Sequence, residues 1–188
     1  MRINRISTLT LLLGSTIAAG SCGSGRAVIV VDVLSFIRQQ ALGDTIPYTI
    51  PTGVKDSVDR PPFATPLIEG LANSTVDSVQ LTIGVDVHNY SGGPGQIKFQ
   101  AFFGDDSATV FTSSHSGADS VTVNGAQVAT LGPTTQTIAT SGDSTFTLSK
   151  VWVGLRASVD ASGAGSTMNG RVQVSVLQLR VILKDKVF

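Results

Sequence analysis

The chain has 188 residues, 13 Lys and Arg balanced by 13 Asp and Glu, 41% hydrophobic residues and a single cysteine. One cysteine excludes an intramolecular disulfide, and a balanced charge argues against a nucleic-acid-binding protein, which would carry a basic excess. The hydrophobic content is too high for a disordered chain. We therefore expect a folded domain with no nucleic-acid partner.

The residue types favour strands over helices. The chain has 22 Val, 20 Thr and 21 Ser but only one Glu, Glu69. β-Branched residues suit a pleated sheet, whereas Glu is among the good helix formers that are scarce here. We predict an all-β fold: an antiparallel β-sandwich, jelly-roll or immunoglobulin-like, formed as a single domain by residues 26–188.

The first 21 residues have the pattern of a secretory signal peptide. Arg2 and Arg5 form a basic head, residues 9–19 are mostly apolar, and small residues precede Cys22. The apolar part is shorter than the roughly 20 residues that a membrane-spanning helix needs. We expect this segment to be cleaved and the protein to be exported.

The run Ala19-Gly20-Ser21-Cys22 resembles the lipobox of bacterial lipoproteins, although the position three before the cysteine, usually Leu, is Ala19. The resemblance implies that Cys22 is acylated and becomes the new N-terminus, with residues 23–25 as a short tether. The membrane would then be a partner through the lipid anchor, and the protein would reside in the bacterial cell envelope, facing the periplasm or the cell surface. The alternative is an ordinary signal peptide cut near Ala19 or Ser21, which leaves Cys22 as a free thiol.

Two segments near the front of the domain differ in character. Residues 27–37 are apolar except for Asp32 and Ser35, which predicts a strand covered on both faces or the start of a short helix through residues 38–42. Residues 46–66 contain five prolines, which lack the N–H that a strand ladder needs. We interpret this second segment as an irregular, Pro-rich excursion along a sheet edge.

Residues with a period of two follow. Alternating apolar residues over 79–87 and 97–103 predict two half-buried antiparallel strands that form a hairpin with a long loop at residues 89–95. A turn at residues 104–106 then leads into residues 108–112. Asn124-Gly125, between two short alternating runs, predicts a two-residue hairpin.

The apolar phase shifts by one residue at two later points. The first shift predicts a β-bulge or a sharp bend, and the second predicts a β-bulge. The first lies at Ser149-Lys150, after Phe146 and Leu148, and the second lies near Val176-Leu177. A long last strand that bends at the second bulge could serve both sheets of a sandwich. Residues 162–166 are small and predict a loop tip.

The sequence contains no motif for a metal site, a cofactor or an active site. Its two histidines, His88 and His115, share no metal-ligand spacing, and we expect both to face solvent. Asp105, Asp106 and Asp119 are weak candidates for Ca²⁺ ligands. Asp is also common in turns, which is the alternative explanation for these residues and for Asp143. No Gly-x-Ser-x-Gly is present. We therefore expect no cofactor and no catalytic residue; a hydrolase would require Asp residues that converge with His88.

Three aromatic residues stand out of phase with the predicted core. Trp152, Phe102 and Tyr90 are candidate ligand-facing aromatics; the alternative for Trp152 is that it packs beneath the Pro-rich excursion. We expect a non-enzymatic envelope lipoprotein that serves as a structural or interaction module, with an envelope protein or a glycan as its partner. The alternative is a carbohydrate- or small-ligand-binding β-sandwich module.

Overall fold

The computed structural model describes residues 26–41, 43–67, 75–91 and 93–184. The predicted signal peptide and Cys22 lie outside these residues. No helix in the described part of the chain is long and apolar enough to cross a membrane. The regular elements are β1 (Arg26–Asp32), α1 (Val33–Arg38), β2 (Thr45–Ile50), β3 (Lys55–Pro66), β4 (Thr75–Asn89), β5 (Pro94–Gly104), β6 (Ser116–Asn124), β7 (Gln127–Thr140), β8 (Lys150–Asp160) and β9 (Met168–Lys184), with two single-turn 3₁₀ helices at Val110–Thr112 and Thr145–Thr147.

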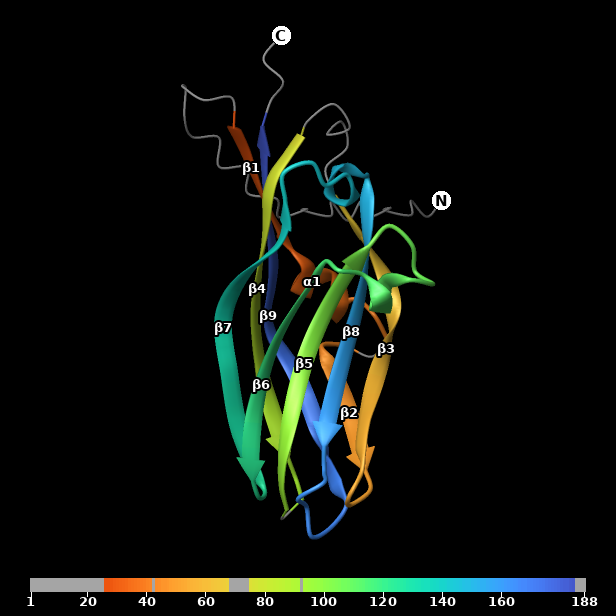
Figure 1. Cartoon of the computed structure of the whole chain (residues 1–188), viewed down its shortest axis with the longest axis vertical. Coiled ribbons are helices and arrows are strands. Elements are labelled where there is room, and N and C mark those ends of the chain that lie inside the picture. Colours follow the sequence, from red (N-terminus) through yellow and green to blue (C-terminus); the bar gives the residue numbers. More distant parts are fainter. Residues whose placement is uncertain (1–25, 42, 68–74, 92, 185–188) are drawn as a thin grey trace, which may run out of the picture.

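The strands form two antiparallel sheets packed face to face, as the sequence predicts (Figure 1). Sheet 1 has the order β2-β9-β4-β7, with β1 beside the other half of β9, and sheet 2 has the order β3-β8-β5-β6. The pairs β5·β6, β4·β7, β3·β8 and β2·β9 are those of one long hairpin rolled into a sandwich. This is the jelly roll, and of the two predicted sandwich types the immunoglobulin-like one is excluded.

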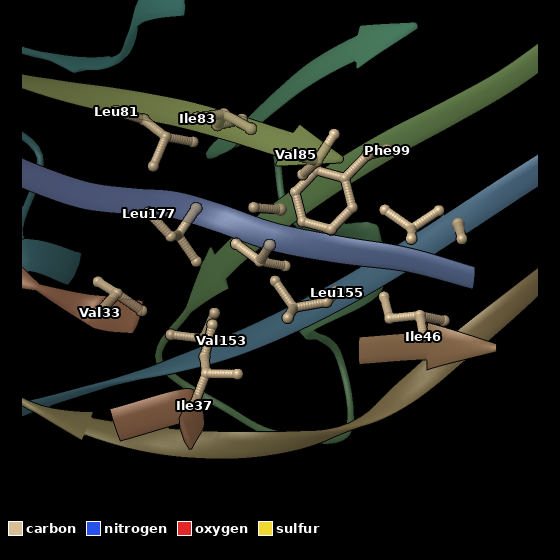
Figure 2. Close-up of a cluster of buried hydrophobic side chains, with 14 of the residues drawn as sticks. Val33, Ile37, Ile46, Leu81, Ile83, Val85, Phe99, Val153, Leu155 and Leu177 are labelled. Carbon is tan, nitrogen blue, oxygen red and sulfur yellow. The ribbon is translucent and has the colours of Figure 1, made fainter. Parts of the chain in front are cut away.

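The core lies between the sheets because alternate side chains on each central strand point inward (Figure 2). The predicted inward set on β4 is fully buried, from Val79 through Val87, and so is the set from Ile97 to Phe103 on β5. Val153 and Leu155 of β8 meet Leu177 and its neighbours on β9 across the gap. The alternation in the sequence is therefore confirmed as the pattern of the core.

The helix α1 fills the gap between the sheets near their β2 and β3 edges (Figures 1 and 2). Its residues Val33, Leu34 and Ile37 are spaced to share one helical face, and all three are buried. The preceding strand β1 is an edge strand whose residues are exposed or half-buried. The prediction of a strand covered on both faces is therefore wrong for this segment. The alternative prediction of a short helix is confirmed, although the helix ends at Arg38.

The Pro-rich segment follows sheet edges, as predicted, but it is regular rather than irregular. It forms β2 and β3, which pair on one side only, with β9 and β8 respectively. An edge strand tolerates proline because half of its N–H groups need no strand partner. Pro61 and Pro62 occupy a β-bulge, since the register with β8 shifts between Arg60 and Phe63.

Two predicted hairpins are instead crossings between the sheets. The strands of residues 79–87 and 97–103 lie in different sheets, and β6 and β7, on either side of Asn124-Gly125, do too. Gly125 has φ of +139°, so the Asn-Gly pair still makes a tight corner. Alternating apolar residues indicate which face of a strand is buried, but they do not indicate which strand pairs with it. Both hairpin predictions were wrong for this reason.

The two predicted changes of apolar phase have different structural causes. Residues 148 and 149 form a bend between the 3₁₀ turn that holds Phe146 and the start of β8, so the change of phase at Ser149-Lys150 is a sharp bend rather than a bulge. The bulge near Val176 is confirmed, because Gly84 pairs with Val176 while Val85 pairs with Val174. β9 nevertheless stays in sheet 1 along its whole length.

Candidate functional site

The outer face of sheet 2 carries a shallow polar depression at the end where β3 and β5 begin and β8 ends. Its two rows of side chains run across three strands, since Asp160 pairs with both Lys55 and Gln96, and Ser158 pairs with both Ser57 and Lys98. The depression has a volume of about 400 Å³. Its lining residues are Lys55, Asp56, Ser57, Gln96, Lys98, Ser158, Val159 and Asp160.

Hydrogen bonds organise one side of this polar depression. Lys55 Nζ lies 2.7 Å from Asp160 Oδ2, and Ser162 donates to Asp160 Oδ1 from its backbone N–H (3.0 Å) and its hydroxyl (2.5 Å). These contacts lower the pKa of Asp160 to about 2, and the hydrogen bond with Lys55 has the largest effect. Asp160 is therefore a carboxylate at neutral pH, and its charge is offset by Lys55.

Lys98 gives the other side of the depression a positive charge. Among the described residues it forms no ion pair, while Ser158, its cross-strand neighbour, shares a hydrogen bond with Ser57 (Oγ to Oγ, 3.1 Å). The depression thus offers ammonium donors, hydroxyls that both donate and accept, and an amide at Gln96. This combination can hydrogen-bond a polyhydroxylated or anionic ligand.

Further along the same face, Arg156 is held by Asp59 and two aromatic rings. Its Nε and Nη2 lie 2.5 and 2.7 Å from the two carboxylate oxygens of Asp59, which raises the pKa of Arg156. Its guanidinium lies 5.4 Å from the ring centre of Phe102 and 5.0 Å from that of Phe111. A Cβ on Gly154 would come within 2.8 Å of the Phe111 ring, so only glycine lets Phe111 cover this part of the sheet.

The predicted aromatics do not form one surface. Phe102 is only 6% exposed, because Phe111 and Arg156 cover it, so the sequence prediction of a ligand-facing ring is wrong there. Trp152 is half-buried on the same face, with Lys150 Nζ at 5.4 Å, and β3 lies beside it in the sheet rather than over it. Tyr90 is 58% exposed but lies in the loop after β4.

One predicted solvent-facing histidine is paired. His115 Nε2 contacts a carboxylate oxygen of Asp143, its Nδ1 lies 3.3 Å from Ser113 Oγ, and its ring centre lies 5.5 Å from that of Phe146 in an edge-to-face arrangement. The Ser113 hydroxyl donates to the Phe103 carbonyl (2.5 Å), so this Ser-His-Asp set joins loops and does not present a nucleophile.

The remaining candidates stay apart. His88 lies on β4 beside Arg171 of β9 and, within the described part of the chain, no Asp pairs with it. Asp105 and Asp106 are exposed in the loop after β5, while Asp119 lies in β6 and accepts a hydrogen bond from Thr134. Residues 26–41, 43–67, 75–91 and 93–184 contain no group of three potential ligands that could hold a metal.

The sequence prediction missed the polar depression. Its residues do have a signal, because polar side chains occupy alternate positions of three strands. That signal marks an outward face, but it cannot show which strands are neighbours, so the depression appears only in the folded sheet.

No family model matches the chain, and no curated protein does. Among solved structures, the chain is similar to one described as PirA, at 12% identity and a TM-score of 0.35, over 72% of this chain and 97% of that one. It is also similar to the VP2 subviral particle of infectious bursal disease virus, at 12% identity and a TM-score of 0.31, over 86% of this chain and 37% of that one.

Proposed function

We propose that this protein is a non-enzymatic bacterial envelope lipoprotein, anchored by acylated Cys22, whose jelly-roll domain is an interaction module. The signal-peptide pattern and the lipobox-like run support the anchor. Only three residues separate Cys22 from Arg26, the first residue of β1, so the two residues are four chain steps apart, which span at most about 14 Å. The start of β1 would therefore lie close to the lipid headgroups.

The observation that carries the proposal is the position of the polar depression relative to this tether. Arg26 pairs with Lys184 at the end of β9, at one end of the sandwich. The depression lies where β3 and β5 begin, which is the opposite end (Figure 1). A domain tethered through β1 would therefore present the depression away from the membrane, where a partner could reach it.

Metabolic labelling with a radioactive fatty acid tests the anchor. We expect wild-type protein to incorporate the label and to partition into the detergent phase of Triton X-114, and Cys22→Ser to do neither. Ser21→Ala is the matched control, because it changes a neighbouring small residue and leaves the thiol. Unlabelled wild-type protein, or equal labelling of Cys22→Ser, would refute the anchor.

A glycan is the second candidate, as the ligand of the same module. The depression is favourable for it because sugar hydroxyls need closely spaced donors and acceptors, which Gln96, Lys98 and Ser158 supply. We expect glycan-array binding that Lys98→Met and Ser158→Val both weaken at least tenfold. Gln178→Ala, an exposed change on the outer face of sheet 1, should leave it intact. Equal binding by all three variants would exclude the depression as the site.

A further inference from the structure

A second, smaller cavity lies between the end of α1 and the bulge of β3. It has a volume of about 160 Å³, roughly that of five water molecules at about 30 Å³ each. Its lining residues are Gln40, Ala41, Arg60, Pro61, Pro62 and Phe63. The wall is thus largely apolar, with one cation, Arg60, and one amide, Gln40.

Arg60 is buried, which is unusual for a permanently charged side chain. Arg60 is 4% exposed and occupies a position of β3 that pairs with the core residue Leu155. Its Nη1 donates to the Gly43 carbonyl, but within the described part of the chain Nη2 has no hydrogen-bond partner. Burial lowers the pKa of the guanidinium, so the charged form is destabilised by its surroundings.

No carboxylate within the described residues forms an ion pair with Arg60. The charge of Asp44 favours the protonated guanidinium and so opposes the fall of the Arg60 pKa. Its oxygens are engaged elsewhere, however: Oδ2 lies 3.2 Å from Arg38 Nε, and Oδ1 accepts from Thr45 Oγ1 at 3.3 Å. A buried cation with a free donor is costly unless an anion pairs with it.

We propose that this cavity is a binding site for a small carboxylate with a short apolar body, whose oxygens pair with Arg60. A carboxylate supplies acceptors that match the guanidinium, and Ala41, Pro61, Pro62 and Phe63 would contact the apolar part. Nη2 itself is covered, so the wall must move slightly to admit an oxygen; the exposed side chain of Gln40 forms part of that wall. The site is independent of the polar depression and of the lipid anchor.

Thermal unfolding of the full-length protein with sodium benzoate tests the proposal, with sodium chloride and benzyl alcohol as references for ionic strength and for the ring. At about ten times its dissociation constant, benzoate should raise the Tm by about 3–6 °C over chloride. Acetate should act at higher concentration, because it lacks the ring, and inorganic phosphate should act no better than acetate. A Tm that benzoate raises no more than chloride or benzyl alcohol does would overturn the proposal.

Substitutions test whether the benzoate-induced rise in Tm comes from binding in this cavity. Arg60→Met should abolish the benzoate shift, whereas Arg180→Gln, an exposed arginine on β9 that donates to Gln80, should retain it. Ala41→Phe keeps the cation but fills the cavity from its exposed rim, so it should also abolish the shift; this variant decides the matter if Arg60→Met does not fold. A benzoate shift that persists in Ala41→Phe would overturn the assignment.

Discussion

Replacing Asn89 by alanine should be among the most damaging polar substitutions in this protein. Asn89 is 2% exposed at the end of β4 and makes four hydrogen bonds. Its Oδ1 accepts from Tyr48 Oη (3.2 Å) and Ser91 Oγ (2.8 Å), and its Nδ2 donates to the carbonyls of Ser91 (3.1 Å) and Gly125 (2.8 Å). One side chain thus joins β2, the loop after β4 and the corner between β6 and β7.

The magnitude follows from these four contacts. A buried hydrogen bond contributes about 1 kcal/mol net, and a buried group that loses its partner costs about as much or more. We therefore expect Asn89→Ala to lower the free energy of unfolding by about 4 kcal/mol. Tyr48→Phe removes one of the four bonds and should cost about 1 kcal/mol, and it should cost less in the Asn89→Ala background because the two groups interact.

Urea unfolding followed by circular dichroism measures both substitutions, with an unchanged m value as the check that the unfolding remains two-state. Asn169→Ala is the control: this exposed asparagine lies on β9 at the same end of the sandwich, and its loss should cost under about 0.5 kcal/mol. If Asn89→Ala came within about 1 kcal/mol of wild type, the reasoning from buried hydrogen bonds would be refuted.

Three further outcomes follow from contacts elsewhere. Gly170→Ala should cost about 3 kcal/mol in urea unfolding, since its Cβ would lie 2.2 Å from the His88 carbonyl oxygen, and a cost below 1 kcal/mol would contradict that contact. Because the pKa of Asp160 is lowered to about 2, its contribution to stability is complete above about pH 4 and is lost as the pH falls towards 2. The difference in urea midpoint between wild type and Asp160→Asn should therefore shrink as the pH falls over that range. A difference that stays constant would count against the Lys55 pairing. Gln136 bonds both the N–H (3.2 Å) and the carbonyl (2.6 Å) of Ala118, so Gln136→Ala should cost about 1–2 kcal/mol and speed hydrogen exchange at the Ala118 amide, and unchanged exchange would argue against this bridge.

The pattern of residues by itself determined the fold class and most of the core. Inward positions such as Leu81, Phe99 and Val153 are readable because the side chains of a strand alternate with a strict period of two. The bulge in β9 was readable for the same reason, since an extra residue shifts that period. Such local regularities need no knowledge of which strands become neighbours.

Tertiary structure alone decided how the strands pair and where polar side chains gather. The Asn124-Gly125 turn suits a hairpin, yet β6 and β7 lie in different sheets, where β6 pairs with β5 and β7 pairs with β4. The same long-range pairing aligns Lys98 with Ser158 and leaves Arg60 beside a cavity. Contacts between residues distant in sequence depend on the whole rolled hairpin, so no local pattern in the chain encodes them individually.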